Sequence, residues 1–117
     1  MMRRYVLALA LLGTGCGGGA GEPGLKAIVG GRLEPSLDAE PIPFSVVVIE
    51  KGTIRAAGPQ SSTPVPKGAE TIDARGKVIQ PMPYTGKVAP GEPADLMIRD
   101  AQTFAPERLM RDGQWVQ

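Results

Sequence analysis

Short runs of β-branched and aliphatic residues recur along the chain about every ten residues, separated by polar segments rich in glycine and proline. The clearest run covers residues 44–50, which are apolar over most of their length. No window carries apolar residues at a sustained helical spacing, so little helix is expected. The pattern predicts a mainly β protein, a small sandwich of short strands. These strands are expected at residues 25–29, 44–50, 53–57, 70–74, 77–80, 96–98, 108–111 and 114–116.

Turn chemistry separates these runs. The 16 glycines and 12 prolines make up about a quarter of the 117 residues, which predicts many turns and short elements. Asp112-Gly113 is the strongest hairpin signal, because both central positions of a two-residue hairpin turn favour positive φ. Lys51-Gly52, Arg75-Gly76 and Pro90-Gly91 are predicted turns as well. Longer loops are expected at residues 32–43, 58–68 and 101–107.

The N-terminal segment is typical of an export signal. Residues 1–4 are positively charged, and residues 5–12 are apolar but far shorter than the roughly 20 residues that span a bilayer. Small residues then precede the only cysteine, Cys16, which predicts a signal peptide over residues 1–15 and a lipid-attachment site at Cys16. Gly13 stands where an aliphatic residue is usual, which leaves ordinary signal cleavage open.

Residues 16–24 are rich in glycine and are expected to form a flexible tether between the lipidated Cys16 and the folded domain. The protein is therefore expected to be exported and anchored by its lipid to a membrane, facing the periplasm or the cell surface. Two alternatives remain open: a soluble secreted protein, and a cytoplasmic protein whose start has been wrongly assigned.

Composition excludes several kinds of chemistry for this chain. It contains no histidine, so imidazole-based acid–base catalysis, histidine-activated nucleophiles and imidazole-ligated zinc are ruled out within it. Its aspartates and glutamates are scattered singly, so no catalytic residue, metal ligand or cofactor is assigned. Cys16 cannot form an internal disulfide. The 13 basic and 12 acidic residues form no basic run, which argues against nucleic acid as a partner.

Several motifs follow one another in a specific order. An Asp-Ala-Arg-Gly-Lys segment lies at residues 73–77, and residues 86–100 combine the Pro-Gly turn with an apolar run bounded by charges. In this order the segments resemble the composite β-sandwich domain of the metal-dependent amidohydrolases, hydrolases that act on non-peptide carbon–nitrogen bonds. The domain would cover residues 25–117, with a first arm at 25–80 and a second arm at 86–117. The matching segments are 27–33, 46–54, 58–59, 65–66, 68–70, 72–78, 86–100 and 109–116.

In that family a catalytic (β/α)₈ barrel separates the two arms and carries the metal-binding histidines, a bridging lysine and a catalytic aspartate. Here residues 81–85 join the arms directly. No position matches the metal-binding histidines, the bridging lysine or the catalytic aspartate, so none is carried over. Asp73 and Asp95 are expected to make hydrogen bonds at turns or strand ends. Lys77 and Lys87 are expected to be solvated turn lysines.

These features support three hypotheses. The first is a barrel-less, amidohydrolase-like lipoprotein that is not catalytic on its own. The second is an internally deleted or decayed amidohydrolase without a function. The third is an accessory β-subunit of a larger, barrel-bearing hydrolase chain. Removal of the barrel should also leave an apolar patch uncovered, with Trp115, Met97 and Phe104 as candidates, although each of them also suits the core.

Overall fold

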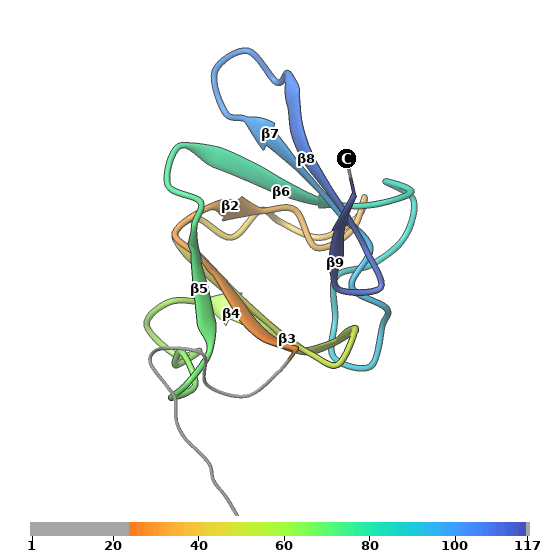
Figure 1. Cartoon of the computed structure of the whole chain (residues 1–117). Helices are drawn as coiled ribbons and strands as arrows, with labels where there is room; N and C mark the ends of the chain where they lie inside the picture. The colour runs from red at the N-terminus through yellow and green to blue at the C-terminus, as the bar shows by residue number, and fades with distance from the viewer. Residues whose placement is uncertain (1–23, 117) are drawn as a thin grey trace, which may run out of the picture.

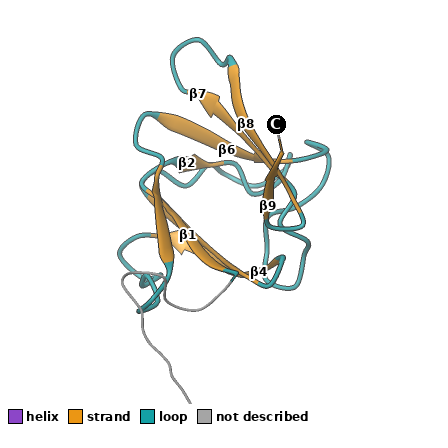
Figure 2. Cartoon of the chain, in the orientation of Figure 1, coloured by secondary structure: helices purple, strands orange, loops and turns teal. Residues whose placement is uncertain are grey.

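The computed structural model describes residues 24–116, which form nine β-strands in two sheets (Figure 1). Within these residues there is no helix (Figure 2), and no helix that could cross a membrane was found in this part of the chain. The predicted mainly β fold of short strands is confirmed. The predicted signal peptide, Cys16 and most of the predicted tether lie outside the described residues.

The first sheet is built entirely from the first arm. Its strand order is β4-β3-β1-β5, with β3 antiparallel to both neighbours and β5 parallel to β1. Central β3 therefore has a strand on either side. The strands are β1 (Leu25–Val29), β3 (Ser45–Glu50), β4 (Thr53–Pro59) and β5 (Glu70–Asp73).

The second sheet combines both arms. Its order is β2-β6-β7-β8-β9, in which β2 and β6 come from the first arm and the other three strands from the second. The β2–β6 pair is parallel and the remaining pairs are antiparallel. The sandwich is thus composite, as the resemblance implies. The strands are β2 (Arg32–Leu33), β6 (Lys77–Pro81), β7 (Leu96–Asp100), β8 (Pro106–Arg111) and β9 (Gln114–Val116).

The main core lies between the two sheets. Residues such as Ile28 and Ile49 from the first sheet pack in one cluster with Ile79, Leu96 and Met110 from the second. A second cluster lies on the outer face of the first sheet, where the outward side chains of β3 pack with Leu25. Central β3 is therefore buried on both faces, which explains its continuous apolar sequence. Each fully buried aliphatic side chain contributes about 1.5–3 kcal/mol.

Several predicted boundaries were wrong. The predicted loop at residues 32–43 contains β2, where Leu33 is buried and exchanges two backbone hydrogen bonds with Ile42 (2.8 and 2.7 Å). The strand predicted from residue 44 begins at Ser45 instead, because Phe44 has a φ of 51° and leaves the extended conformation.

Other elements differ in length from the prediction. β4 reaches Pro59, where a proline is tolerated because β4 is an edge strand. β7 extends to Asp100 and β8 begins at Pro106, so the predicted loop at residues 101–107 is shorter. β5 ends at Asp73, one residue before the predicted end.

The hairpin turns have the predicted backbone conformation. Asp112 and Gly113 lie at φ 49° and 79°, and Lys51 and Gly52 at φ 53° and 85°. Positive φ at both central positions matches the right-handed twist of the flanking strands. The turn between β3 and β4 and the turn between β8 and β9 thus adopt the same hairpin geometry, one in each sheet.

These two turns touch through their backbones. A Cβ atom on Gly113 would lie 2.8 Å from the Gly52 Cα, and one on Gly52 would lie 2.8 Å from the Asp112 carbonyl oxygen. Ala94 joins the turns further, because its N–H donates to the Gly52 carbonyl (2.9 Å) and its carbonyl accepts from the Gly113 N–H (3.0 Å). The two sheets are therefore fastened together at this end of the sandwich.

We predict that Gly113→Ala destabilises the protein more than Gly76→Ala does. Gly76 has nearly the same φ (78° against 79°), but a Cβ there meets nothing within 4 Å. Both variants share the strain of a left-handed alanine, whereas Gly113→Ala also forces the two turns apart, at an extra cost of about 1–3 kcal/mol. Urea denaturation followed by circular dichroism measures both. Equal losses would contradict the close contact between the turns.

Candidate functional site

The point at which the resemblance places a barrel lies between two paired neighbouring strands. β6 ends and β7 begins side by side, with Pro81 opposite Leu96 in the antiparallel register. Just beyond this pair, the Met82 N–H donates to the Asp95 carbonyl oxygen (2.9 Å). The ladder therefore continues to the last residues of the strands, and residues 82–95 form the whole connection between them.

This connection is attached to the rest of the sandwich along its length. The Val88 N–H donates to the Pro35 carbonyl (2.8 Å). Further along, Gly91 and Glu92 exchange hydrogen bonds with Ile54 on β4 (2.9 and 2.8 Å). Val88 and Ala94 are buried in the main core. The Pro90-Gly91 turn is present as predicted, with Gly91 at φ 92°.

A shallow cavity of about 300 Å³ opens beside the start of this connection. Two large side chains on its wall, Leu37 and Tyr84, are 64% and 62% exposed. Its polar wall is Glu34, which accepts a hydrogen bond from the Gln80 side-chain amide (2.8 Å) and forms an ion pair with Arg32 (3.2 Å). We call this the junction cavity. It offers an apolar contact surface beside a carboxylate whose oxygens are already hydrogen-bonded.

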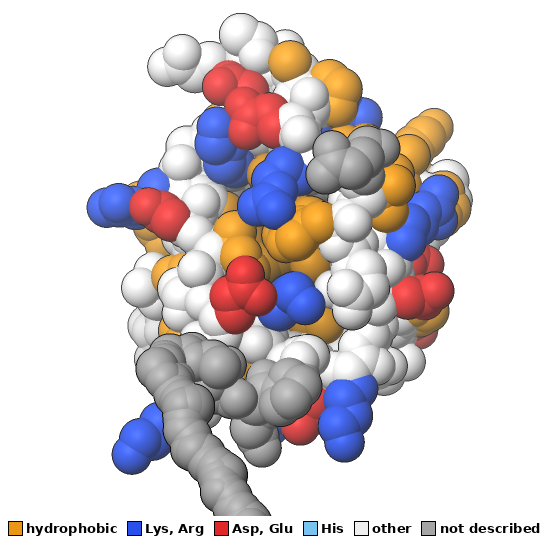
Figure 3. Space-filling model, viewed as in Figure 1, with side chains coloured by type: hydrophobic (Ala, Val, Ile, Leu, Met, Phe, Trp, Pro, Cys, Tyr) orange, Lys and Arg blue, Asp and Glu red, His pale blue; other side chains and the backbone are white. Residues whose placement is uncertain are grey.

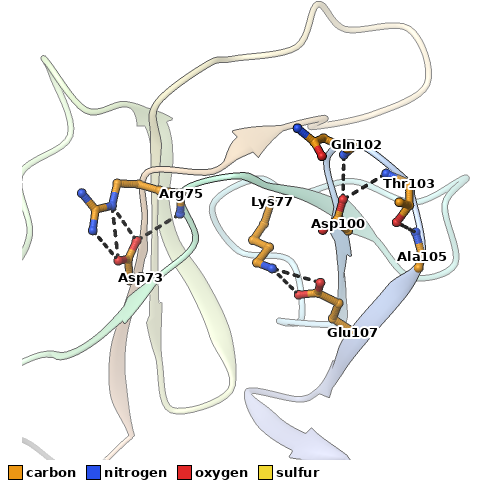
Figure 4. Close-up of polar contacts among 8 residues, drawn as sticks. All are labelled: Asp73, Arg75, Lys77, Asp100, Gln102, Thr103, Ala105 and Glu107. Carbon is orange, nitrogen blue, oxygen red and sulfur yellow. Dashed lines mark hydrogen bonds and ion pairs between the residues drawn. The ribbon is translucent and has the colours of Figure 1, made fainter.

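The two aspartates expected at turns have that role. Both Asp73 oxygens accept from the Arg75 guanidinium, and one also accepts from the Arg75 backbone N–H (Figure 4). These side-chain and backbone hydrogen bonds lower the pKa of Asp73 from 3.8 to about 2. Asp95 accepts from the backbone N–H of Asp112 (2.7 Å) and so stabilises the β8–β9 turn.

The expectation that Lys77 is a solvated turn lysine was wrong. Its ammonium forms an ion pair with Glu107 on β8 at 2.7 Å, reaching across β7 (Figure 4). The hydrogen bond from Lys77 to Glu107 raises the lysine pKa. Thirty residues separate the two partners, so no local sequence signal marks the pair. Lys87, in contrast, is exposed in the connection, as expected.

The carboxylate of Asp100 was not identified from the sequence. It accepts hydrogen bonds from the backbone N–H groups of Thr103 and Gln102 (3.0 and 2.8 Å), and these bonds lower its pKa (Figure 4). An aspartate side chain that bonds the backbone two residues further on is a usual start of such a turn. Like Asp73 and Asp95, Asp100 therefore stabilises a turn.

The three candidates for an uncovered apolar patch have different surroundings. Trp115 is half-buried against the main core, with the Arg108 guanidinium 3.7 Å from its ring centroid. Met97 is half-buried and pairs with Leu109 across β7 and β8. Phe104 is 44% exposed, and its ring lies 4.9 Å from the guanidinium of Arg99. They do not form one patch around the junction cavity.

Figure 3 shows hydrophobic surface in the middle of one face of the molecule, between edge strands β5 and β9, with charged side chains of both signs around it. These two strands contribute half-buried Ile72 and Trp115 to the main core. Among residues 24–116, no group of three or more histidine, cysteine, aspartate or glutamate side chains is placed to hold a metal ion.

No family model matches the chain, and no curated protein matches it. Among solved structures, the chain is similar to one described under "Structural and catalytic characterization of molinate hydrolase". The sequence identity is 38% and the TM-score is 0.44; the match covers 49% of this chain and 12% of the other. The likeness is therefore a partial one, to a small part of a larger hydrolase.

We predict that Asp73 contributes to the acid sensitivity of the fold. Its folded pKa of about 2 lies below its ordinary value of 3.8, so its stabilising effect is present above about pH 4 and is lost as the pH falls to about 2. Asp73→Asn should therefore be less stable than the wild type at pH 6, and the difference should shrink between pH 4 and pH 2. Chemical denaturation at a series of pH values measures it.

Arg75→Gln is the matched variant, because it removes the guanidinium that donates to Asp73 while keeping the carboxylate. In Arg75→Gln, the loss of stability that the wild type shows between pH 4 and pH 2 through Asp73 should be absent. A difference between Asp73→Asn and wild type that stays constant from pH 6 to pH 2 would contradict the assignment.

Proposed function

We propose that this protein is a non-catalytic β-sandwich related to the amidohydrolases and held at a membrane surface by a lipid on Cys16. The observation that carries the proposal is the closed connection between β6 and β7. Residues 81–85 join the two arms where the resemblance places the barrel, and the start of the second arm, residues 86–95, bonds to both sheets through its backbone. A sandwich completed in this way needs no barrel to satisfy its hydrogen bonds.

The polar groups of the described domain support a non-catalytic role. Asp73, Asp95 and Asp100 each accept hydrogen bonds from turn backbone, and Lys77 is paired with Glu107. These groups stabilise local structure, and the 117 residues include no histidine that could act as a general base. Export and lipid attachment rest on the N-terminal sequence alone.

The second hypothesis, a decayed or internally deleted enzyme, predicts a poorly fitted junction. Against it stand the buried side chains of Val88 and Ala94 and the Val88 hydrogen bond to Pro35. The third hypothesis, an accessory subunit, draws support from the exposed Leu37 and Tyr84 at the junction cavity. Such side chains suit a contact with a larger hydrolase chain better than contact with water.

We predict that the chain folds cooperatively on its own. The full chain carrying Cys16→Ser should give a β-type circular dichroism spectrum, a single thermal transition and one monomeric peak on a sizing column. The two interlocked sheets and the shared core explain why one transition is expected. A featureless spectrum or an aggregating sample would contradict the proposal and favour a decayed or obligately complexed chain.

We also predict that Cys16 carries lipid. Cells that express the full chain and are fed radiolabelled palmitate should incorporate the label, and the protein should partition with membranes. Cys16→Ser should lose both properties and keep the fold of the described domain, residues 24–116. Mass spectrometry of the mature N-terminus decides the result: an unmodified N-terminal residue would instead indicate soluble secretion.

A further inference from the structure

Both phenylalanines of the chain, Phe44 and Phe104, lie in the left-handed region of backbone conformation. Their φ values are 51° and 63°. This conformation is unfavourable for a bulky residue, and such backbone outliers cluster at functional sites such as ligand-binding sites. The contacts of each ring indicate whether the phenylalanine stabilises the fold itself.

The position of Phe104 is explained by local contacts. Its ring lies 4.9 Å from the guanidinium of Arg99, which also donates to the Phe104 carbonyl (3.1 Å). Its N–H donates to the carbonyl of Asp100 and closes the turn between β7 and β8 (2.8 Å). The ring of Phe104 therefore has a partner within the domain.

The position of Phe44 is different. Its backbone is fixed on the carboxyl side, because its carbonyl accepts from the Gln60 N–H (2.9 Å) and the next residue, Ser45, donates to the Gly31 carbonyl through its N–H and hydroxyl (2.9 and 2.7 Å). The ring, however, is 69% exposed. A glycine would meet the same backbone requirement without strain. The hydrogen-bonded backbone thus presents an aromatic side chain at the surface, where it adds little to the core.

A cavity of about 380 Å³ lies against this ring. The half-buried Val29 and the backbone of Gly30 extend its apolar part. Its polar lining residues are Gln60, Thr71 and the ion pair of Asp73 and Arg75. We call this the Phe44 cavity. It lies on the outer part of the first sheet and shares none of its lining residues with the junction cavity.

The charges in the Phe44 cavity indicate that its ligand is neutral. Asp73 and Arg75 neutralise each other through hydrogen bonds of 2.8–3.2 Å, so the cavity favours neither an anion nor a cation. Gln60 and Thr71 each offer both a donor and an acceptor. An aromatic face beside a few fixed polar groups suits a neutral ligand that has one apolar face and several hydroxyl groups.

We propose that the Phe44 cavity binds a pyranose ring of a neutral carbohydrate. The apolar C–H face of the sugar stacks on the Phe44 ring, and its hydroxyl groups exchange hydrogen bonds with Gln60, Thr71 and the Asp73–Arg75 pair. The hydrogen bonds on the carboxyl side of Phe44 set the point at which the ring leaves the backbone before the sugar binds. This proposal depends on the sandwich alone and on neither export nor lipid attachment.

The test is an NMR titration of the ¹⁵N-labelled full chain carrying Cys16→Ser. The probes are N-acetylglucosamine and its β-1,4-linked trisaccharide, with adenosine as a flat, neutral heterocycle. We expect both sugars to shift the amide signals of Phe44, Gln60 and Asp73. Equal affinities would identify a single free sugar as a sufficient ligand, and tighter binding of the trisaccharide would identify a polysaccharide chain; either supports the proposal.

Variants separate a binding role of Phe44 from a structural one. Phe44→Gly should weaken sugar binding about tenfold through the loss of stacking, while its melting temperature stays within a few degrees of that of the wild type. Phe44→Tyr keeps the ring and should retain binding. Phe104→Gly is the matched control, since it removes the other left-handed phenylalanine away from the cavity, and it should leave the sugar affinity unchanged.

Three results would overturn the proposal. The first is the absence of sugar-induced shifts at the cavity while the chain is folded. The second is unchanged sugar affinity in Phe44→Gly. The third is binding of adenosine without binding of either sugar, which would assign the cavity to a planar heterocycle instead. None of these results bears on whether Cys16 is lipidated, so the two proposals stand or fall separately.

Discussion

The structure depends on a close backbone contact between two hairpin turns. Gly52 and Gly113 come from different sheets and different arms, and neither position has space for a side chain. Ala94 bridges the two turns through its N–H and its carbonyl, and the Asp95 carboxylate holds the backbone of the second turn. The short segment before β7 therefore sets how the two sheets face each other, and the main core forms around that arrangement.

This contact explains why the two arms form one folding unit. The first arm provides a complete four-stranded sheet. It also provides β6 of the second sheet, and β6 would have a free edge without β7 beside it. The second arm provides a meander whose inner residues, such as Leu96 and Met110, are buried in the core that it shares with the first arm. Neither arm alone can satisfy both its backbone hydrogen bonds and its apolar surface.

Local sequence features predicted the strands and turns well, because β-branched runs and Asp-Gly or Pro-Gly pairs act through neighbouring residues. Features set by distant partners were missed. Strand β2 exists because Leu33 is buried between β6 and Ile42, and Lys77 is ordered because Glu107 lies two strands away. The left-handed backbone of Phe44 likewise depends on bonds to Gln60 and, through Ser45, to Gly31. No short window of sequence contains these pairings.

The strand order also determines when the fold can form. Both parallel pairs join distant segments, with Lys26 beside Glu70 and Arg32 beside Val78, whereas β7, β8 and β9 follow one another as a meander. Pairs that close long loops form slowly, and local hairpins form fast. As the chain is synthesised, β6 cannot pair until β7 has been made. The contact between the two hairpin turns cannot form until Gly113 has been made. The two-sheet domain therefore stays incompletely folded until the chain has been made as far as the β8–β9 turn.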